Sequence, residues 1–382
     1  MNLFEKQYEK ILHSLQFEDF TFTLKRIIDL TLDTEDFSFY KKTYNLLAWV
    51  DYNQSNTEEK KEKYLTILQE LHQFLSKKEI KSQKCLLEIN NLKKSYSKSP
   101  FALGPINLKI SEGEIIGLVG ENGNGKTTLL RSLCKELNPT EGEIKYHFTY
   151  SDIYDLRTQL IYIPQRTNNW YGSMLDNLRF TASCYGVASE ENELITDLIL
   201  SRMGLRDYKK LSWKNLSSGY KMRFELARML LRKPKLLLID EPLANLDIMA
   251  QQIVLDDFKA IAKSPFRPLG IVLSSQQLYE VEKTSDQVIF LKHGEQRNLK
   301  TETIDNKIHE FIIEFESDWN QEELYKTFQQ LNLIKLHYNG GTYIANFPAT
   351  TSIKNFLETI IQENIPIKYF RDISNSTRRF FI

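Results

Sequence analysis

Apolar residues in the first part of the chain recur at the three- and four-residue spacing of amphipathic helices. One series comprises Phe37, Tyr40, Tyr44 and Leu47, and a second comprises Tyr64, Ile67, Leu68, Leu71, Phe74 and Leu75. A polar, charge-rich stretch from Asp51 to Lys63 separates the two series and is expected to be a break between helices. The pattern predicts an N-terminal helical segment over residues 1–83, either a small bundle docked on the neighbouring domain or a partner-binding module.

Near Leu86 the pattern changes to one that is typical of strands. LLEINNLKKSY predicts a strand followed by a turn, and INLKI at residues 106–110 predicts a second strand. From there strand-like and helix-like segments alternate to about residue 300, which predicts an α/β domain with a mostly parallel sheet over residues 84–304. Helical patterns over residues 173–205 interrupt this alternation, so we expect a helical insertion between strands.

The last part of the chain, residues 305–382, predicts a separate small domain. Its segments are EFIIEF, QEELYKTFQQL, LIKLHY, a turn at Gly340-Gly341, TYIANF, IKNFLETIIQ and IKYFRDI. They follow the order β-α-β-β-α-β of a ferredoxin-like α+β domain. This domain contains no recognisable catalytic constellation, and we expect it to be regulatory or dimer-forming.

Composition excludes several classes of protein. Lys plus Arg and Asp plus Glu both number 50, so the net charge is zero and no nucleic acid partner is expected. No stretch approaches 18 uninterrupted apolar residues, and the N-terminus does not resemble a signal peptide. The cysteines, Cys85, Cys134 and Cys184, are scattered singly, which favours a reducing, cytoplasmic location. If the protein works at a membrane, another chain must supply the spans.

A glycine-rich motif follows the apolar, strand-like run Ile115–Val119. The residues that fit G-x-x-x-x-G-K-[ST], with the next one, are Gly120, Glu121, Asn122, Gly123, Asn124, Gly125, Lys126, Thr127 and Thr128. Glycines allow backbone N–H groups to turn around phosphate oxygens, and the following helix adds its positive dipole end. Lys126 would then reach the β- and γ-phosphates of a nucleotide, and Thr127 would hold Mg²⁺. The alternative is a chance glycine-rich turn, which composition allows in about one chain in a hundred.

A second candidate feature is an apolar strand, residues 236–239, that ends in Asp240 and Glu241. A carboxylate at the carboxyl end of a parallel strand lies beside the phosphate loop, where Asp240 would hold Mg²⁺ through water. Glu241 is then placed to polarise an attacking water as general base. The alternative is a polar turn at the end of a strand.

Together these residues resemble the ATP-binding cassette (ABC) family of P-loop NTPases. The family's L-S-G-G-Q signature has its counterpart at Leu216, Ser217, Ser218, Gly219 and Tyr220. Gln165 resembles the glutamine loop, Tyr96 the aromatic residue that stacks on adenine, and Ala244-Asn245-Leu246-Asp247 the D-loop. The resemblance covers roughly residues 85–300, and the order and spacing of the motifs make it specific.

The resemblance implies a dimer in which two ATP molecules lie between two cassettes. Each ATP would contact the phosphate loop of one cassette and the signature of the other, with Gln165 as a further Mg²⁺ ligand and catalytic group. It implies a separately encoded transmembrane permease that contacts the helical insertion, which the resemblance places after Gln165 at about residues 166–215. It also implies a peripheral position on the cytoplasmic face of the membrane. The segment NLRFTASCYGV and the extra domain after the cassette resemble exporter-type cassettes.

The sequence departs from the family pattern at the nucleotide site. Gln276 stands where the family has its switch histidine, and glutamine can donate a hydrogen bond but cannot become cationic. Ser218 replaces the first signature glycine, and Tyr220 replaces the signature glutamine. These changes are either tolerated drift or signs of a slow ATPase or of a partner with a complementary signature.

Two other functions remain open at this point. One is a soluble ABC ATPase that acts on nucleic acid or ribosomes, against which the zero net charge and the single cassette argue. The other is an ATP sensor without hydrolysis, which the substitution at Gln276 motivates.

Overall fold

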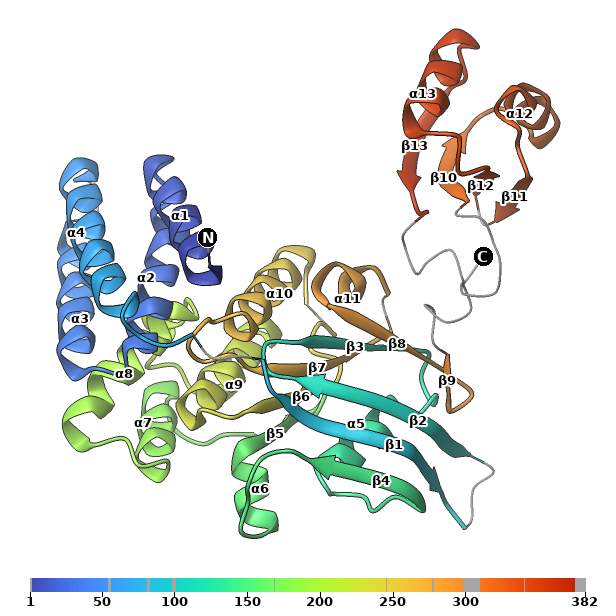
Figure 1. Cartoon of the computed structure of the whole chain (residues 1–382). Helices are drawn as coiled ribbons and strands as arrows, with labels where there is room; N and C mark the ends of the chain where they lie inside the picture. The colour runs from blue at the N-terminus through green and yellow to red at the C-terminus, as the bar shows by residue number, and fades with distance from the viewer. Residues whose placement is uncertain are drawn as a thin grey trace.

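The structure of the protein is a computed structural model, which describes residues 2–374 except 54–55, 81–82, 98–100, 168, 245, 277, 298–309 and 340. In chain order it comprises an N-terminal helical bundle, an α/β part and a C-terminal α+β part (Figure 1). The predicted boundary between residues 304 and 305 lies outside the described residues. Among the helices of the described ranges, none has the length and apolar character needed to cross a membrane.

The N-terminal bundle consists of helices whose starts are fixed by side-chain caps. They are α1 (Leu3–Gln16), α2 (Phe20–Thr34), α3 (Phe37–Tyr52) and α4 (Thr57–Leu75). Asn2, Asp19, Asp36 and Asn56 each accept a hydrogen bond from a backbone N–H in the first turn. The predicted break over residues 51–63 is therefore wrong beyond Asn56. The charged run belongs to α4, where its residues are exposed or half-buried while Tyr64 is buried.

The α/β part contains two sheets. The larger has the strand order β5-β6-β7-β3-β8-β9 and is parallel except at β9. Its strands are β3 (Ile115–Val119), β5 (Leu160–Ile163), β6 (Leu236–Ile239), β7 (Gly270–Ser275), β8 (Gln287–Lys292) and β9 (Glu295–Arg297). An antiparallel sheet of order β2-β1-β4 comprises β1 (Cys85–Ser95), β2 (Ala102–Ser111) and β4 (Glu141–Tyr146). The sequence predicted β1 and β2 but not their separation into a second sheet.

Helices cover the parallel sheet and form the predicted insertion. Around the sheet lie α5 (Lys126–Leu133), α6 (Ile153–Gln159), α9 (Ser218–Arg232), α10 (Ile248–Ala262) and α11 (Leu278–Thr284). The insertion contains α7 (Met174–Cys184), α8 (Ser189–Arg202) and the 3₁₀ turns η1 (Arg206–Tyr208) and η2 (Trp213–Asn215). Strand β3 is buried on both faces: Ile115 and Val119 join one apolar cluster, and Ile116 and Leu118 join the other.

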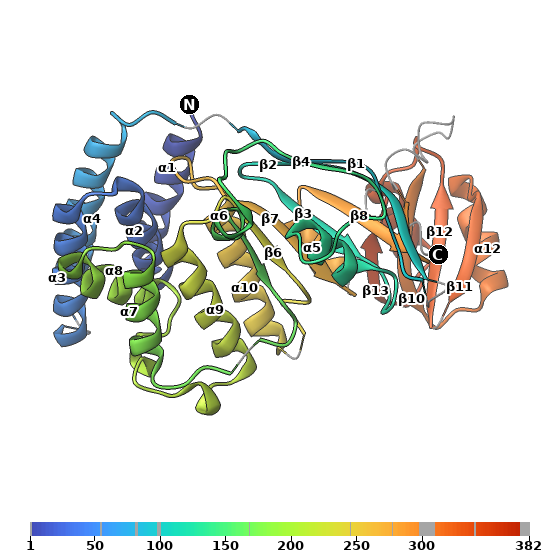
Figure 2. The same ribbon diagram turned by 90° about the horizontal axis from the view of Figure 1, so that it is seen from below.

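The N-terminal bundle is docked on the α/β part, as one of the two sequence alternatives predicted. Ile28 and Leu32 of α2 belong to the same apolar cluster as Leu198 of α8. Arg202 of α8 is buried and donates to Asp29 of α2 at 2.8 Å, and it also contacts Asp257 of α10. Both views show α2 and α3 beside α8 (Figure 2). This docking does not exclude a partner-binding role for the bundle, which stays a prediction.

The C-terminal part has the predicted ferredoxin-like order. It contains β10 (Phe311–Ser317), α12 (Gln321–Phe328), η3 (Gln329–Leu331), β11 (Lys335–Asn339), β12 (Thr342–Phe347), α13 (Ile353–Gln362) and β13 (Ile367–Asp372). The strands pair antiparallel in the order β11-β12-β10-β13. Buried phenylalanines of the sheet and both helices, among them Phe315, Phe328 and Phe356, form its core.

Candidate nucleotide-binding site

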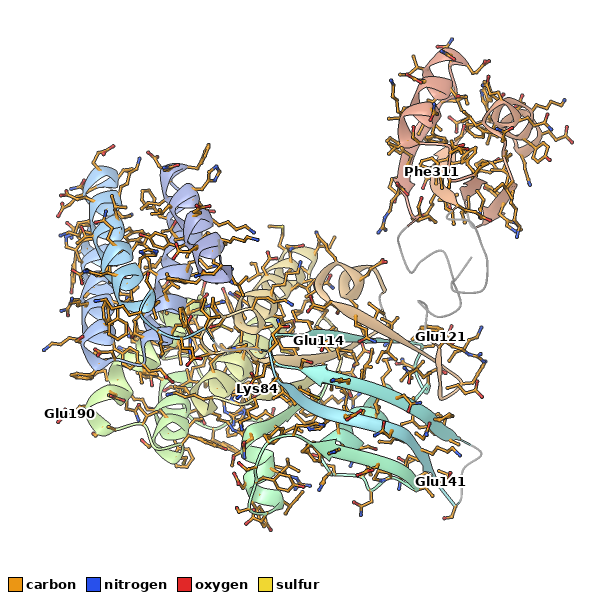
Figure 3. The ribbon with its side chains drawn as sticks, viewed as in Figure 1. Lys84, Glu114, Glu121, Glu141, Glu190 and Phe311 are labelled. Atoms are coloured by element: carbon orange, nitrogen blue, oxygen red, sulfur yellow. The ribbon has the colours of Figure 1, made fainter. Side chains whose placement is uncertain are left out.

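The glycine-rich loop connects the carboxyl end of β3 to the start of α5. Figure 3 labels Glu114 and Glu121 at the two ends of β3. A Cβ atom on Gly120 would lie 2.4 Å from the carbonyl oxygen of Leu291, so packing requires glycine there. At Gly123, with φ of +84°, an added Cβ would meet no atom within 4 Å. The loop is therefore packed tightly at its base and open at Gly123.

Lys126, the first residue of α5, returns its side chain into this loop. The side chain is only 5% exposed, and its Nζ donates to the carbonyl oxygens of Gly120 at 2.7 Å and Glu121 at 3.3 Å. Its Nζ also lies 3.1 Å from Oε1 of Glu241. A buried ammonium group is costly unless anions or polar atoms surround it. Lys126 thus provides a positive charge inside the loop, beside a carboxylate.

Asp240 connects the acid-ended strand β6 to the phosphate loop. Its carboxylate is buried and accepts hydrogen bonds from Thr127 Oγ1 at 2.6 Å and Ser274 Oγ at 2.6 Å, and a longer one from the Tyr162 hydroxyl at 3.4 Å. Burial and the nearby charge of Asp240 raise the pKa of Tyr162, which keeps its hydroxyl a donor. The contact between Thr127 and Asp240 joins the two predicted halves of the site.

Glu241 adopts a backbone conformation that is unusual for a residue other than glycine. Its φ is +49°, and its N–H donates to Ser274 Oγ at 2.9 Å, which holds the residue in place. Oε1 of Glu241 is buried and has no hydrogen-bond partner among the described residues, since its contact with Lys126 is an ion pair without hydrogen-bond geometry. Strained backbone and an unsatisfied buried oxygen are features that concentrate at functional sites.

These side chains fit a magnesium–triphosphate group. The loop is open at Gly123, Lys126 supplies buried positive charge, and Thr127 and Asp240 present adjacent hydroxyl and carboxylate oxygens. Oxygen ligands of these types are the ones that Mg²⁺ prefers. Oε1 of Glu241, which forms an ion pair with Lys126 but no hydrogen bond, adds an acceptor for a water proton beside them.

The sheet order brings further predicted residues to the same edge. Strands β5, β6, β7 and β3 are neighbours and parallel, so their carboxyl ends lie together. Gln165 follows β5 after one residue, and Gln276 follows β7 directly; both side chains are exposed. Ligands of α/β sheets bind at this edge. Tyr96 lies elsewhere, just after β1, with its ring half-exposed and Lys94 Nζ 5.3 Å from the ring centre.

The signature-like segment forms the beginning of α9. Ser217 caps the helix by accepting from the backbone N–H of Tyr220, Ser218 is the first helical residue, and both side chains are exposed. Leu216 and Gly219 are buried. The start of a helix carries partial positive charge, so this surface suits an anion supplied by another molecule.

Asp247 of the D-loop segment lies at the start of α10. Its carboxylate caps α10 by accepting from the backbone N–H of Ala250 at 2.8 Å. Asn245 lies outside the described residues. The next side chains, Ile248 and Met249, are 82% and 73% exposed, so the segment beside Asp247 presents apolar surface to solvent.

Sequence reasoning missed Tyr162 and Ser274, which hold Asp240 and Glu241 in place. Both are polar residues in the apolar strand segments IYIPQR and GIVLSS. A hydroxyl group within a buried parallel strand needs a hydrogen-bond partner. That requirement could have indicated that both residues contact a polar group of the site.

Comparison with known proteins gives the family. A model described as "ABC transporter" matches residues 103–244. The phosphonates import ATP-binding protein PhnC of Treponema denticola is 30% identical over 224 residues, which are 55% of this chain and 87% of PhnC. The lantibiotic transport ATP-binding protein SrtF of Streptococcus pyogenes is 32% identical over 214 residues, 55% of this chain and 88% of SrtF. The chain belongs to the ABC transporter family. As a member it is an ABC transporter ATPase, which binds ATP and couples its hydrolysis to transport.

Solved structures agree with this ABC ATPase fold. The structure of cbiO1 from Clostridium perfringens, part of the ABC transporter complex cbiONQ, has a TM-score of 0.52 and 26% identity. That match covers 65% of this chain and 96% of cbiO1. The cassette MJ0796, in a dimeric post-hydrolysis state bound to ADP and Pi, shares the fold with a TM-score of 0.50 and 23% identity, over 56% of this chain and 97% of MJ0796. The predicted family, the α/β cassette and the helical insertion are confirmed.

Proposed function

We propose that this ABC ATPase powers an exporter, and that Lys126, Thr127, Asp240 and Glu241 act together on one ATP molecule. The observation that carries the proposal is the pair of contacts that join the phosphate loop to the acid-ended strand. Thr127 Oγ1 lies 2.6 Å from Asp240 Oδ2, and Lys126 Nζ lies 3.1 Å from Glu241 Oε1. Residues 120–128 would surround the phosphates, and Tyr96 would stack on the adenine.

Each residue has a role that its geometry supports. Mg²⁺, when bound, would neutralise charge on the β- and γ-phosphates, held by Thr127 and Asp240 with Gln165 as a further ligand. Lys126 would exchange its carbonyl partners for phosphate oxygens. Glu241 would take a proton from a water whose oxygen attacks the γ-phosphorus, while the bond from that phosphorus to ADP breaks. Ser274 would hold the backbone of Glu241 during this step.

A second copy of the cassette, or a related one, would complete the site. The exposed Ser217 and Ser218 at the start of α9 suit contact with a phosphate bound by the partner cassette. The apolar side chains of Ile248 and Met249 beside Asp247 are solvent-exposed in the single chain and would be covered in such a dimer.

A separately encoded permease would contact the helical insertion, at about residues 166–215, on the cytoplasmic face of the membrane. The relative cbiO1 is part of an ABC transporter complex, cbiONQ, which supports the proposal that the ATPase and the permease are separate subunits. Exposed aromatic side chains on the insertion, Tyr171 at 87% and Phe180 at 69%, support a protein partner there. The zero net charge favours this partner over nucleic acid.

Export is the proposed direction of transport, supported by NLRFTASCYGV and by the domain after the cassette. The names of the relatives include both import and lantibiotic transport, so the direction needs its own test. We place the division of the chain at residues 1–83, 84–304 and 305–382, with the last as a regulatory or dimer-forming domain.

Gln276 favours a second candidate, an ABC ATPase whose hydrolysis is slow and whose ATP binding is regulatory. Gln276 is exposed at the catalytic edge, directly after β7, and it cannot carry the charge of a histidine. Under this alternative the closed cassette dimer with bound ATP would be long-lived, and slow hydrolysis would serve only to reopen it.

Affinity purification of the full-length chain from gently solubilised membranes tests the transporter proposal. We expect a polytopic membrane protein to co-purify, and inverted vesicles that contain both chains to accumulate substrate only with ATP. Recovery with RNA or ribosomes and without a membrane protein would contradict the proposal. Uptake into right-side-out cells would contradict export while leaving the ATPase assignment intact.

A further inference from the structure

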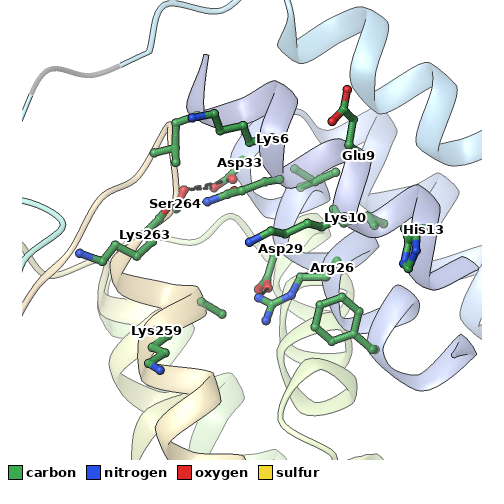
Figure 4. A pocket seen from close by; sticks show the side chains of 16 residues that line it. Lys6, Glu9, Lys10, His13, Arg26, Asp29, Asp33, Lys259, Lys263 and Ser264 are labelled. Atoms are coloured by element: carbon green, nitrogen blue, oxygen red, sulfur yellow. Dashed lines mark hydrogen bonds and ion pairs between the residues drawn. The ribbon is translucent and has the colours of Figure 1, made fainter. Parts of the chain in front are cut away.

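A cavity of about 760 Å³ lies where the N-terminal bundle meets α10, away from the phosphate loop. Helices α1 and α2 form one side of it, and the carboxyl-terminal end of α10 with residues 263–264 forms the other (Figure 4). Its apolar lining comes from Leu3, Ile11, Phe22, Leu30 and Ala260. Its volume is within the range of pockets that hold small organic ligands.

The acidic groups of this cavity are mostly neutralised within the protein. The carboxylate of Asp29 forms ion pairs with the guanidinium groups of Arg26, at an N–O distance of 2.9 Å, and of Arg202, at 2.8 Å. The carboxylate of Asp33 forms an ion pair with Arg267 at 2.7 Å and accepts a hydrogen bond from the hydroxyl of Ser264 at 3.0 Å. These carboxylates are therefore already paired with arginines that the fold fixes in place.

The lysines of the cavity are not neutralised in the same way. Within the described ranges, the side chains of Lys6, Lys10 and Lys259 have no hydrogen-bond or ion-pair partner, whereas Lys263 pairs with Asp286 at 2.6 Å. Figure 4 shows the ammonium end of Lys10 reaching into the space between α1 and α10, and the carboxylate of Glu9 turned away from it. Like charges gathered around one opening repel each other, so an anion placed between them would be stabilised.

We propose that this cavity binds an amphipathic anion, a small molecule that carries a phosphate or carboxylate group on an apolar body. The three lysines would contact the anionic group, and Ile11, Phe22 and Ala260 would contact the apolar body. Such a ligand touches the bundle and α10 at once and so favours their docked arrangement. The proposal is independent of the ATPase chemistry, because none of these side chains belongs to the phosphate-loop edge.

Isothermal titration calorimetry of the full chain tests this site with octyl phosphate, inorganic phosphate and neutral octyl glucoside, each below its micelle concentration. Saturating Mg-ADP keeps the phosphate loop filled. We expect binding of one octyl phosphate per chain, at least about 10-fold tighter than either of the other two probes, since each lacks half of the recognised chemistry.

Two variants locate the binding. Lys6→Gln with Lys10→Gln and Lys259→Gln should weaken octyl phosphate binding about 10- to 100-fold through lost charge-assisted contacts. The matched control removes the same charge at the exposed Lys41, Lys145 and Lys210, and should change affinity less than about 2-fold by the screening of exposed charges. Ala260→Phe keeps every lysine but fills the cavity, and should also weaken binding about 10-fold by steric exclusion.

Several outcomes would overturn the proposal. Equal affinities for octyl phosphate and octyl glucoside would reveal a merely apolar surface. Equal weakening by the two lysine triples would reveal a general effect of net charge. Unchanged binding of octyl phosphate by Ala260→Phe would place the ligand outside the cavity. Binding of the chain to phosphatidylglycerol vesicles, without binding of monomeric octyl phosphate, would also place the ligand outside the cavity.

Discussion

Two of the regions that bury charged side chains, the junction at Arg202 and the phosphate loop at Lys126, differ in how those charges are paired. At the junction between the N-terminal bundle and the cassette, the guanidinium of Arg202 contacts the carboxylates of Asp29 and Asp257. At the phosphate loop, the ammonium of Lys126 donates to neutral carbonyl groups and faces a carboxylate without hydrogen-bond geometry. A triphosphate would be a better partner for Lys126, whereas Arg202 already has two anions. Incomplete pairing beside an open loop, rather than burial itself, distinguishes a binding site from a structural junction.

At the junction, the pKa of each buried group depends on the balance between burial and its charged partners. Burial by itself raises the pKa of Asp29, but Arg202 and Arg26 outweigh it, so the net pKa is lowered. At Asp33 burial outweighs Arg267, and the net pKa is raised. Burial also lowers the pKa of Arg202, but Asp29 and Asp257 outweigh it and raise the net value. These opposing shifts belong to one packed network that fixes the bundle to α8 and α10.

The largest effect is expected for Glu241→Gln. Glutamine keeps the size of the side chain but cannot accept a proton from water, so ATP turnover should fall about 10²- to 10⁴-fold. ATP binding should persist, since Lys126 and residues 120–128 are unchanged. Phosphate release under multiple turnover measures the rate, and Glu136→Gln, which alters an exposed partner of Arg131, serves as the control. Turnover at the parent rate would exclude Glu241 as the general base.

Arg202→Met tests the other side of the comparison. It leaves Asp29 and Asp257 without their buried cation, and the free energy of unfolding should fall by about 3–5 kcal/mol. Urea unfolding measures this loss. Arg179→Met, which breaks an exposed ion pair with Glu193 at 3.1 Å, should cost less than about 1 kcal/mol. Equal losses in the two variants would show that the Arg202 network does not stabilise the junction.

The two regions also differ in how far the sequence specifies them. The phosphate loop could be predicted because its groups are consecutive residues, and Asp240 because strand ends of a parallel sheet share an edge. Arg202 and Asp29 are separated by 173 positions, and no local pattern indicates that they meet. Tyr162 and Ser274 were missed for a related reason: their partner, Asp240, follows the end of another strand, β6. The C-terminal order was predictable because each element there is short and strictly patterned.

The smallest effect is expected for Gln276→His. Histidine would add a group that can become cationic at the catalytic edge, where Lys126 and Glu241 are already present, and turnover should rise by a few-fold. The same phosphate-release assay measures it, with Gln276→Asn as the control that keeps the amide. A rate that is unchanged or lower than the parent rate would show that Gln276 is not an impaired switch.

ATP binding by the full-length chain and by Lys126→Ala, measured by equilibrium dialysis with Mg²⁺, tests the proposed nucleotide site most directly. Lys145→Ala removes a charge from an exposed side chain and serves as the control, with unfolding measured for all three proteins. We expect one ATP per chain for the parent and the control, and loss of binding in a folded Lys126→Ala. Parent-like binding by Lys126→Ala, or a parent protein that ignores ATP, would contradict the proposed site.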